Sequence, residues 1–143
     1  MNAMGGHDIE DIQVGMRGTY AKTVTEADII LFAGVTGDNN PVHIDAEAAA
    51  STMFKERIAH GMLSAGFISA VLGTKLPGPG AIYMSQTRRF KAPVKIGDTV
   101  TATCTVTEVV PEKRRAMLST VCKIGDTVVI EGEAMVMVPS RPK

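Results

Sequence analysis

The stretch from Gly61 to Leu72 is apolar on every side when drawn as a helix, and Gly73, directly after it, is a typical helix end. A helix of this kind needs cover from other elements. After the turn-rich sequence Leu76-Pro77-Gly78-Pro79-Gly80, the chain becomes rich in Val, Thr and Ile, which favour strands. The predicted strands are Ala81 to Lys91, Thr99 to Val110, Arg115 to Ile124 and Thr127 to Val138.

Two further helices are predicted before that stretch. One runs from Thr25 to about Gly37 behind a Thr23 or Thr25 cap, and the other from Ala46 to about Phe54 with Asp45 as its N-cap. Helices followed by antiparallel strands indicate an α+β fold. One antiparallel sheet wrapped around one central helix is the hot-dog arrangement, which is the fold we expect. Its open sheet edges would be covered by a second copy, so we expect a homodimer or a dimer of dimers.

The composition limits the number of domains and the kinds of partner. A length of 143 residues without a linker predicts a single domain over 1–143, in which the polar segment 1–14 is poorly ordered. The 15 basic and 15 acidic residues cancel, so no overall field favours nucleic acid or an anionic membrane. Only 4% of residues are aromatic, which argues against a base-stacking surface. The expected partner is a small molecule, with no nucleic acid and no membrane.

The cysteines and apolar segments predict a cytoplasmic protein. Cys104 and Cys122 lie in predicted strands without Cys-x-x-Cys spacing, so we interpret them as buried free thiols of a reducing compartment. The segment Met1 to Gln13 lacks the basic start and apolar run of a secretory signal. The longest apolar stretch, around Met62 to Leu72, is too short to span a bilayer.

The segment from Gly37 to Asp45 carries the residues suited to chemistry. On one continuous helix, Asp38 and His43 would point about 140° apart, because each residue turns the helix by roughly 100°. Pro41 disfavours the helical region for the residue before it, so the chain must bend here. After that bend a carboxylate and an imidazole can converge on one water molecule and exchange protons with it near neutral pH. The alternatives are an Asx turn at Asp38, a core histidine at His43 and a helix cap at Asp45.

Several segments in this order resemble the MaoC-like, (R)-specific enoyl-CoA hydratases over roughly residues 15 to 138. The residues that carry the hydratase-2 motif are Asp38-Asn39-Asn40-Pro41-Val42-His43-Ile44-Asp45 and Ile58-Ala59-His60-Gly61-Met62-Leu63. The likeness continues through Leu76-Pro77-Gly78, Phe90-Lys91-Ala92-Pro93-Val94 and Gly97-Asp98. The short members with a single hot-dog domain, which supply (R)-3-hydroxyacyl-CoA for polyhydroxyalkanoate synthesis, are the most similar.

The resemblance implies roles for particular residues. Asp38 and His43 would be the catalytic pair, and the backbone N–H of Gly61, at the start of the central helix, would bind the thioester oxygen. A helix N-terminus has unpaired N–H groups and partial positive charge, which suits developing enolate charge. Ser69 and Asn40 would lie beside the acyl pocket. For Ser69, a core serine bonded to its own helix is the alternative.

The implied reaction is the addition of water to a trans-2-enoyl-CoA, which gives the (R)-3-hydroxyacyl-CoA. It needs neither a metal nor an organic cofactor, and the histidines and cysteines show no metal-ligand spacing. Arg88, Arg89 and Lys91 are candidates for the coenzyme A phosphates, as are Lys95, Lys55 and Arg57. The alternative for each is a solvated surface charge.

Three other activities remain open from sequence. The first is an acyl-CoA thioesterase on the same fold, which would need a carboxylate-activated water at the carbonyl carbon. The second is a dehydratase that acts on acyl-carrier-protein thioesters. The third is an acyl-CoA-binding module without catalysis. The sequence does not favour a serine hydrolase. The G-x-S-x-G motif of such enzymes is one residue shorter than the matching segment here, Gly61-Met62-Leu63-Ser64-Ala65-Gly66.

Overall fold

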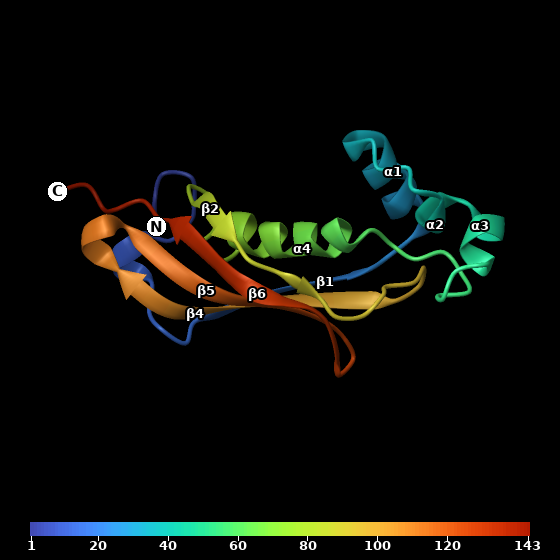
Figure 1. Ribbon diagram of the computed structural model, residues 1–143. Helices are drawn as coiled ribbons and strands as arrows, with labels where there is room; N and C mark the ends of the chain where they lie inside the picture. The colour runs from blue at the N-terminus through green and yellow to red at the C-terminus, as the bar shows by residue number, and fades with distance from the viewer.

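The computed structural model describes residues 1–143 and shows one antiparallel sheet with a long helix along one face (Figure 1). The sheet has six strands in the order β1-β4-β5-β6-β2, and β3 also pairs with β6. The strands are β1 (Arg17–Thr23), β2 (Ile82–Gln86), β3 (Arg89–Phe90), β4 (Thr99–Val110), β5 (Arg115–Ile124) and β6 (Thr127–Met137). The helices are α1 (Glu26–Thr36), α2 (Pro41–Ile44), α3 (Ala46–Ala50) and α4 (Gly61–Thr74), with short 3-10 turns at Ile9–Asp11 and Pro111–Lys113. The α+β hot-dog fold is thus confirmed.

Helix α4 is the predicted central helix, but the sheet covers only one of its sides. Its buried residues include Ile68, Val71 and Leu72, which join the core formed by the inward residues of β4 and β5. On the other side, Met62 is 45% exposed, and Gly66, Ser69 and Gly73 are also exposed. The cover expected for this helix is therefore incomplete in the single chain, because the sheet lies along only one face of α4.

The long strands follow the alternation of the sequence. In β4, Val100, Ala102, Cys104 and Val106 are buried against α4, while the threonines between them are not. Both cysteines are free and fully buried, as predicted. The strand expected over Ala81 to Lys91 is divided into β2 and β3. The main chain at Thr87 lies so close to Gly132 on β6 that a Cβ there would stand 1.9 Å from the Thr87 carbonyl oxygen.

The helices before α4 form a group that extends beyond one end of the sheet (Figure 1). Helix α1 has the predicted Thr25 cap, with Asp28 completing a capping box, and ends at Gly37 in the left-handed conformation. Asp45 caps α3 as predicted, although α3 ends at Ala50 rather than near Phe54. The short helix α2 was not predicted. Helix α1 has already ended at Gly37 when the chain reaches Pro41, which occupies the first turn of this new helix, where its missing N–H costs nothing.

The segment before β1 packs against the body of the protein. Ile9 and Ile12 belong to the core, and the Ile9 N–H donates to the carbonyl of Pro139 over 2.7 Å. The expectation that residues 1–14 are poorly ordered is therefore wrong for this part of the segment, because two isoleucines among polar residues supply apolar anchors. No helix has both the length and the apolar character needed to cross a membrane.

Candidate active site

The loop between α1 and α2 places Asp38 and His43 by local hydrogen bonds. The carboxylate of Asp38 accepts the Asn40 N–H over 3.3 Å, and the side chain of Asn40 accepts the Val42 N–H over 3.2 Å as the cap of α2. Asn40 is exposed and does not line the cavity described below, so in this chain it shapes the loop rather than the acyl pocket.

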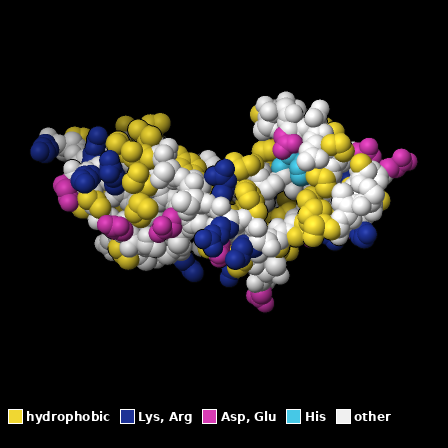
Figure 2. All heavy atoms as spheres, viewed as in Figure 1, with side chains coloured by type: hydrophobic (Ala, Val, Ile, Leu, Met, Phe, Trp, Pro, Cys, Tyr) yellow, Lys and Arg dark blue, Asp and Glu magenta, His cyan; other side chains and the backbone are white.

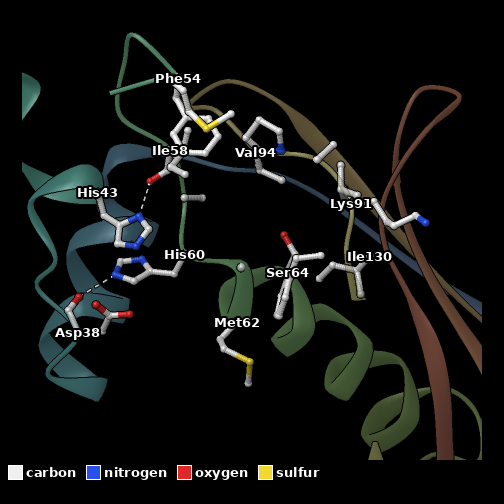
Figure 3. Close-up of a pocket in the computed structure, with 17 residues that line it drawn as sticks. Asp38, His43, Phe54, Ile58, His60, Met62, Ser64, Lys91, Val94 and Ile130 are labelled. Carbon is white, nitrogen blue, oxygen red and sulfur yellow. Dashed lines mark hydrogen bonds between the residues drawn. The ribbon is translucent and has the colours of Figure 1, made fainter. Parts of the chain in front are cut away.

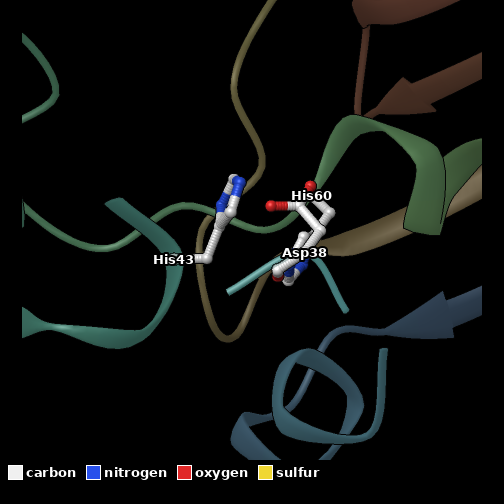
Figure 4. A group of neighbouring side chains, drawn as sticks. All are labelled: Asp38, His43 and His60. Atoms are coloured by element: carbon white, nitrogen blue, oxygen red, sulfur yellow. The ribbon is translucent and has the colours of Figure 1, made fainter. Parts of the chain in front are cut away.

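The structure brings Asp38 and His43 together with a third residue, His60 (Figure 4). One nitrogen of each histidine and one carboxylate oxygen of Asp38 all lie within 4.8 Å of one another. Asp38 is exposed, whereas both histidines are buried. The predicted convergence of the acid and the imidazole is therefore present, and His60, which the sequence indicated only as part of a motif, joins them.

The orientation of the His43 ring is set by one hydrogen bond. Its Nδ1 lies 2.8 Å from the carbonyl oxygen of Ile58. A carbonyl can only accept, so Nδ1 carries the proton and donates it. The lone pair of neutral His43 is then on Nε2, the nitrogen suited to accept a proton from water.

Asp38, His43 and His60 do not form a preorganised metal site, although two histidines and a carboxylate are a common ligand set. The rings of His43 and His60 are stacked, with centroids 3.9 Å apart and planes 27° apart. Nitrogen lone pairs lie in the ring planes, so those of two nearly parallel rings do not converge on one ion. A metal would require one ring to rotate.

A cavity of about 520 Å³ opens beside Asp38 and His43 (Figure 3). Most of its wall is apolar, which is typical of small-molecule sites. The residues of the wall are Asp38, His43, Met53, Phe54, Ile58, Ala59, His60, Gly61, Met62, Ser64, Phe90, Lys91, Ala92, Pro93, Val94, Val129 and Ile130. Figure 2 shows the corresponding hollow, with histidine side chains at its upper edge and an acidic side chain directly above them.

The first residue of α4 faces this cavity with an unpaired N–H. Neither the N–H of Gly61 nor that of Met62 has an acceptor within the chain, as expected at a helix start. The ring of Phe90 packs directly on Gly61, where a Cβ would stand 2.6 Å from its nearest carbon. Glycine is therefore required here for close packing, and it leaves the N–H accessible to a ligand.

The structure places Ser64, rather than Ser69, in the cavity. Ser69 is exposed on the uncovered side of α4 and does not line the cavity, so the prediction that places it at the acyl pocket is not met within one chain. Ser64 lines the cavity, is 1% exposed, and has no hydrogen-bond partner for its hydroxyl. Sequence spacing shows which residues share a helix face but not which face a sheet covers.

The basic residues predicted to contact the coenzyme A phosphates lie in different environments. Lys91 lines the cavity and lies 3.3 Å from Glu131. Arg89, in β3, and Arg88, directly before that strand, are exposed. Arg57 is not available for a phosphate, because it is already paired with Glu26 and its side chain is only 16% exposed.

Comparison with known proteins defines the class. The MaoC like domain family matches residues 10–132, and the chain belongs to this family. The (R)-specific enoyl-CoA hydratase of Rhodospirillum rubrum is 62% identical, with 94% of each chain covered. The 3-hydroxybutyryl-CoA dehydratase of Methylorubrum extorquens is 52% identical over 92% of this chain and 84% of its own. An unliganded R-hydratase from Pseudomonas aeruginosa superposes with a TM-score of 0.90 at 46% identity, covering 95% of this chain and 88% of that one.

Proposed function

We propose that the protein interconverts trans-2-enoyl-CoA and (R)-3-hydroxyacyl-CoA by adding water across the double bond. The observation that carries the proposal is the position of Asp38 and His43 at one cavity, with the free N–H of Gly61 in its wall. The names of the relatives from Rhodospirillum rubrum and Methylorubrum extorquens support the same chemistry.

The geometry suggests how the steps proceed. The thioester oxygen accepts a hydrogen bond from Gly61 N–H, which draws electrons from C3. A water molecule between Asp38 and His43 gives a proton to this pair while its oxygen bonds to C3, and the electrons of the double bond move toward the thioester as an enolate. The pair then returns a proton to C2, so the net change is the addition of one water molecule. No metal or organic cofactor takes part, and we expect EDTA to leave the rate unchanged.

The test is turnover of crotonyl-CoA, followed by chiral analysis of the product. We expect loss of the enoyl absorbance without release of free thiol, and an (R) product. Asp38→Asn and His43→Gln should each lower kcat by at least about 10²-fold, and Asp38→Asn, at an exposed side chain, should leave the thermal unfolding midpoint unchanged. Release of thiol would instead indicate a thioesterase, and an (S) product would contradict the proposal. Binding of acyl-CoA without turnover would indicate a binding module.

A carrier-protein substrate is the second candidate, because mitochondrial relatives from Solanum lycopersicum and Arabidopsis thaliana are named 3-hydroxyacyl-[acyl-carrier-protein] dehydratases, at 37% and 32% identity. We propose that coenzyme A is preferred here, since the two more similar relatives above are named for coenzyme A thioesters. Comparing kcat/KM for the same acyl group on each carrier distinguishes the two.

Arg88, Arg89 and Lys91 are the proposed contacts of the coenzyme A phosphates. Lys91 is in the cavity wall, and the two arginines precede it in the chain, separated from it by Phe90. Arg88→Glu and Arg89→Glu should raise KM for crotonyl-CoA and leave kcat within about twofold, since phosphate contacts act on binding. Lys113→Glu, in the hairpin turn between β4 and β5, is the matched control and should change neither constant. An unchanged KM in both arginine variants would remove them from the site.

We also propose that the protein is cytoplasmic and that two copies of it pair along β2. Strand β2 bonds only to β6, so its other edge is free, and its Ile82, Tyr83 and Met84 are at least 40% exposed. Such an edge with apolar side chains favours pairing with another strand. Light scattering should give twice the mass of one chain for the wild type. For Met84→Pro it should give the mass of a single chain. In that dimer the uncovered side of α4, including Ser69, would face the second copy.

A further inference from the structure

His60 is a buried residue to which the proposed mechanism gives no part. It is 2% exposed and precedes Gly61 at the start of α4. One face of its ring stacks on His43, and the ring of Phe32 lies 4.7 Å away. Figure 3 shows it between His43 and Asp38 at the end of the cavity.

The surroundings of the two ring nitrogens of His60 show which of them donates a hydrogen bond. Its Nε2 lies 2.8 Å from the main-chain carbonyl oxygen of Asp38. The carbonyl can only accept, so Nε2 carries a proton and donates it. Its Nδ1 is buried without a partner.

The hydrogen bond from His60 is the one that joins the loop of Asp38, Asn39 and Asn40 to a distant part of the chain. The other hydrogen bonds of Asp38, Asn39 and Asn40 all come from residues within the same short segment, Thr36 to His43. Asp38 itself is exposed, so packing does not hold it. Without the bond from His60, the position of the carboxylate relative to α4 would depend on the loop alone.

We propose that His60 is a positioning residue for the hydration: it holds Asp38 by donating to its carbonyl, and it holds His43 by stacking on its ring. It thereby fixes both members of the pair relative to Gly61, its neighbour in the chain. The proposal rests on the proposed function for its effect on rate. A displacement of about 1 Å in a catalytic group can cost about a hundredfold in rate, so this constraint is expected to matter.

Two substitutions separate the two contacts. His60→Phe keeps a stacking ring and loses the donor, whereas His60→Gln keeps a donor at a similar reach and loses the ring. On crotonyl-CoA we expect kcat to fall about 10- to 100-fold in His60→Phe and less in His60→Gln, with KM within about threefold of wild type in both. Partial rescue by Gln is the result that a purely packing role would not give.

His7 supplies the matched control, because its Nδ1 also bonds to a carbonyl, that of Pro77, over 3.1 Å and away from the cavity. His7→Phe should change the unfolding midpoint but not kcat. A wild-type kcat in folded His60→Phe would overturn the proposal, as would a loss of rate that only follows the unfolded fraction. A rise in KM at constant kcat would also overturn it, because His60 would then be a substrate contact.

A readout that does not depend on turnover is hydrogen exchange of the amides of residues 38–40. Exchange should become faster in His60→Phe than in wild type, while that of the sheet stays the same. If wild type fails to hydrate crotonyl-CoA, the proposed function fails, and this measurement still decides whether His60 anchors the loop. Unchanged exchange in His60→Phe would overturn the anchoring itself.

Discussion

Arg57 and Glu26 are joined by two charged hydrogen bonds, 2.6 Å from Nη1 and 3.1 Å from Nη2. The same guanidinium donates from Nε to the carbonyl oxygen of His43 over 2.7 Å. Arg57 thus connects the first turn of α1 to the main chain at His43. The planar fork of arginine permits all three bonds, whereas lysine offers one point charge.

Arg57→Lys is therefore expected to weaken this connection although the charge is kept. We expect the free energy of unfolding to fall by about 1 kcal/mol, since the pair is partly exposed, and kcat to fall several-fold as the His43 segment loosens. Urea unfolding and crotonyl-CoA kinetics measure the two effects. Lys55→Met, at an exposed neighbouring cation, is the control. Equal effects of both changes would show that the loss is not specific to the three hydrogen bonds of Arg57.

Gly61→Ala tests the start of α4. The added methyl group would collide with the Phe90 ring, which is 52% exposed and can move, so the protein should still fold. We expect kcat/KM to fall about 10²-fold, because the methyl group also stands in the way of a ligand approaching the N–H. The double variant Gly61→Ala with Phe90→Leu removes the collision alone. If it regained the rate of Phe90→Leu, Gly61 would serve packing only.

Two substitutions of Ser64 test its effect on stability and on the size of the cavity separately. Ser64→Ala removes a buried hydroxyl that has no partner, so the free energy of unfolding should stay the same or rise by up to about 1 kcal/mol. Ser64→Leu narrows the cavity and should lower kcat/KM on long 2-enoyl-CoA chains more than on crotonyl-CoA. A series of chain lengths measures this. Equal losses at every length would mean that Ser64 does not line the acyl part of the cavity.

Asp45 caps α3, with its carboxylate accepting the N–H groups of Glu47 and Ala48 over 3.0 and 3.1 Å. Asp45→Ala should therefore cost about 1 kcal/mol of unfolding free energy while kcat stays within about twofold. The contrast with Asp38→Asn, which should lower kcat at constant stability, assigns different roles to two carboxylates of one motif. A large loss of kcat in Asp45→Ala would contradict the cap interpretation.

The two cysteines give a prediction that depends on pH. Burial raises the pKa of the Cys104 thiol to about 12, with its neighbour Cys122 adding to the effect, and burial also raises the pKa of Cys122 to about 12. Both groups therefore remain protonated thiols in the folded protein at pH 8, well below these values. A disulfide reagent at pH 8 should titrate no thiol in the native protein and two in guanidinium chloride. Rapid native reaction would show that the core between α4 and the sheet opens.

Much of the fold was predictable because its determinants are local. The Val, Thr and Ile content of Thr99 to Val110 predicted the strand, the Thr25 cap predicted the start of α1, and Pro41 predicted the bend between Asp38 and His43. Each depends on backbone sterics or on spacing within a few residues. The N-terminal segment was misjudged because packing of Ile9 and Ile12 depends on the distant Pro139 region.

The sequence by itself determined that a carboxylate and an imidazole meet at a bend before an apolar helix, since Pro41 and the hydrophobic pattern dictate those features. The tertiary structure alone decided which side of α4 the sheet covers, and so which serine, Ser64 or Ser69, enters the cavity. It also decided that His60 stacks on His43 and holds Asp38, and that Arg57 binds Glu26 rather than a ligand. These contacts join residues distant in the chain, and their geometry exists only once the sheet, α4 and the preceding helices have packed together.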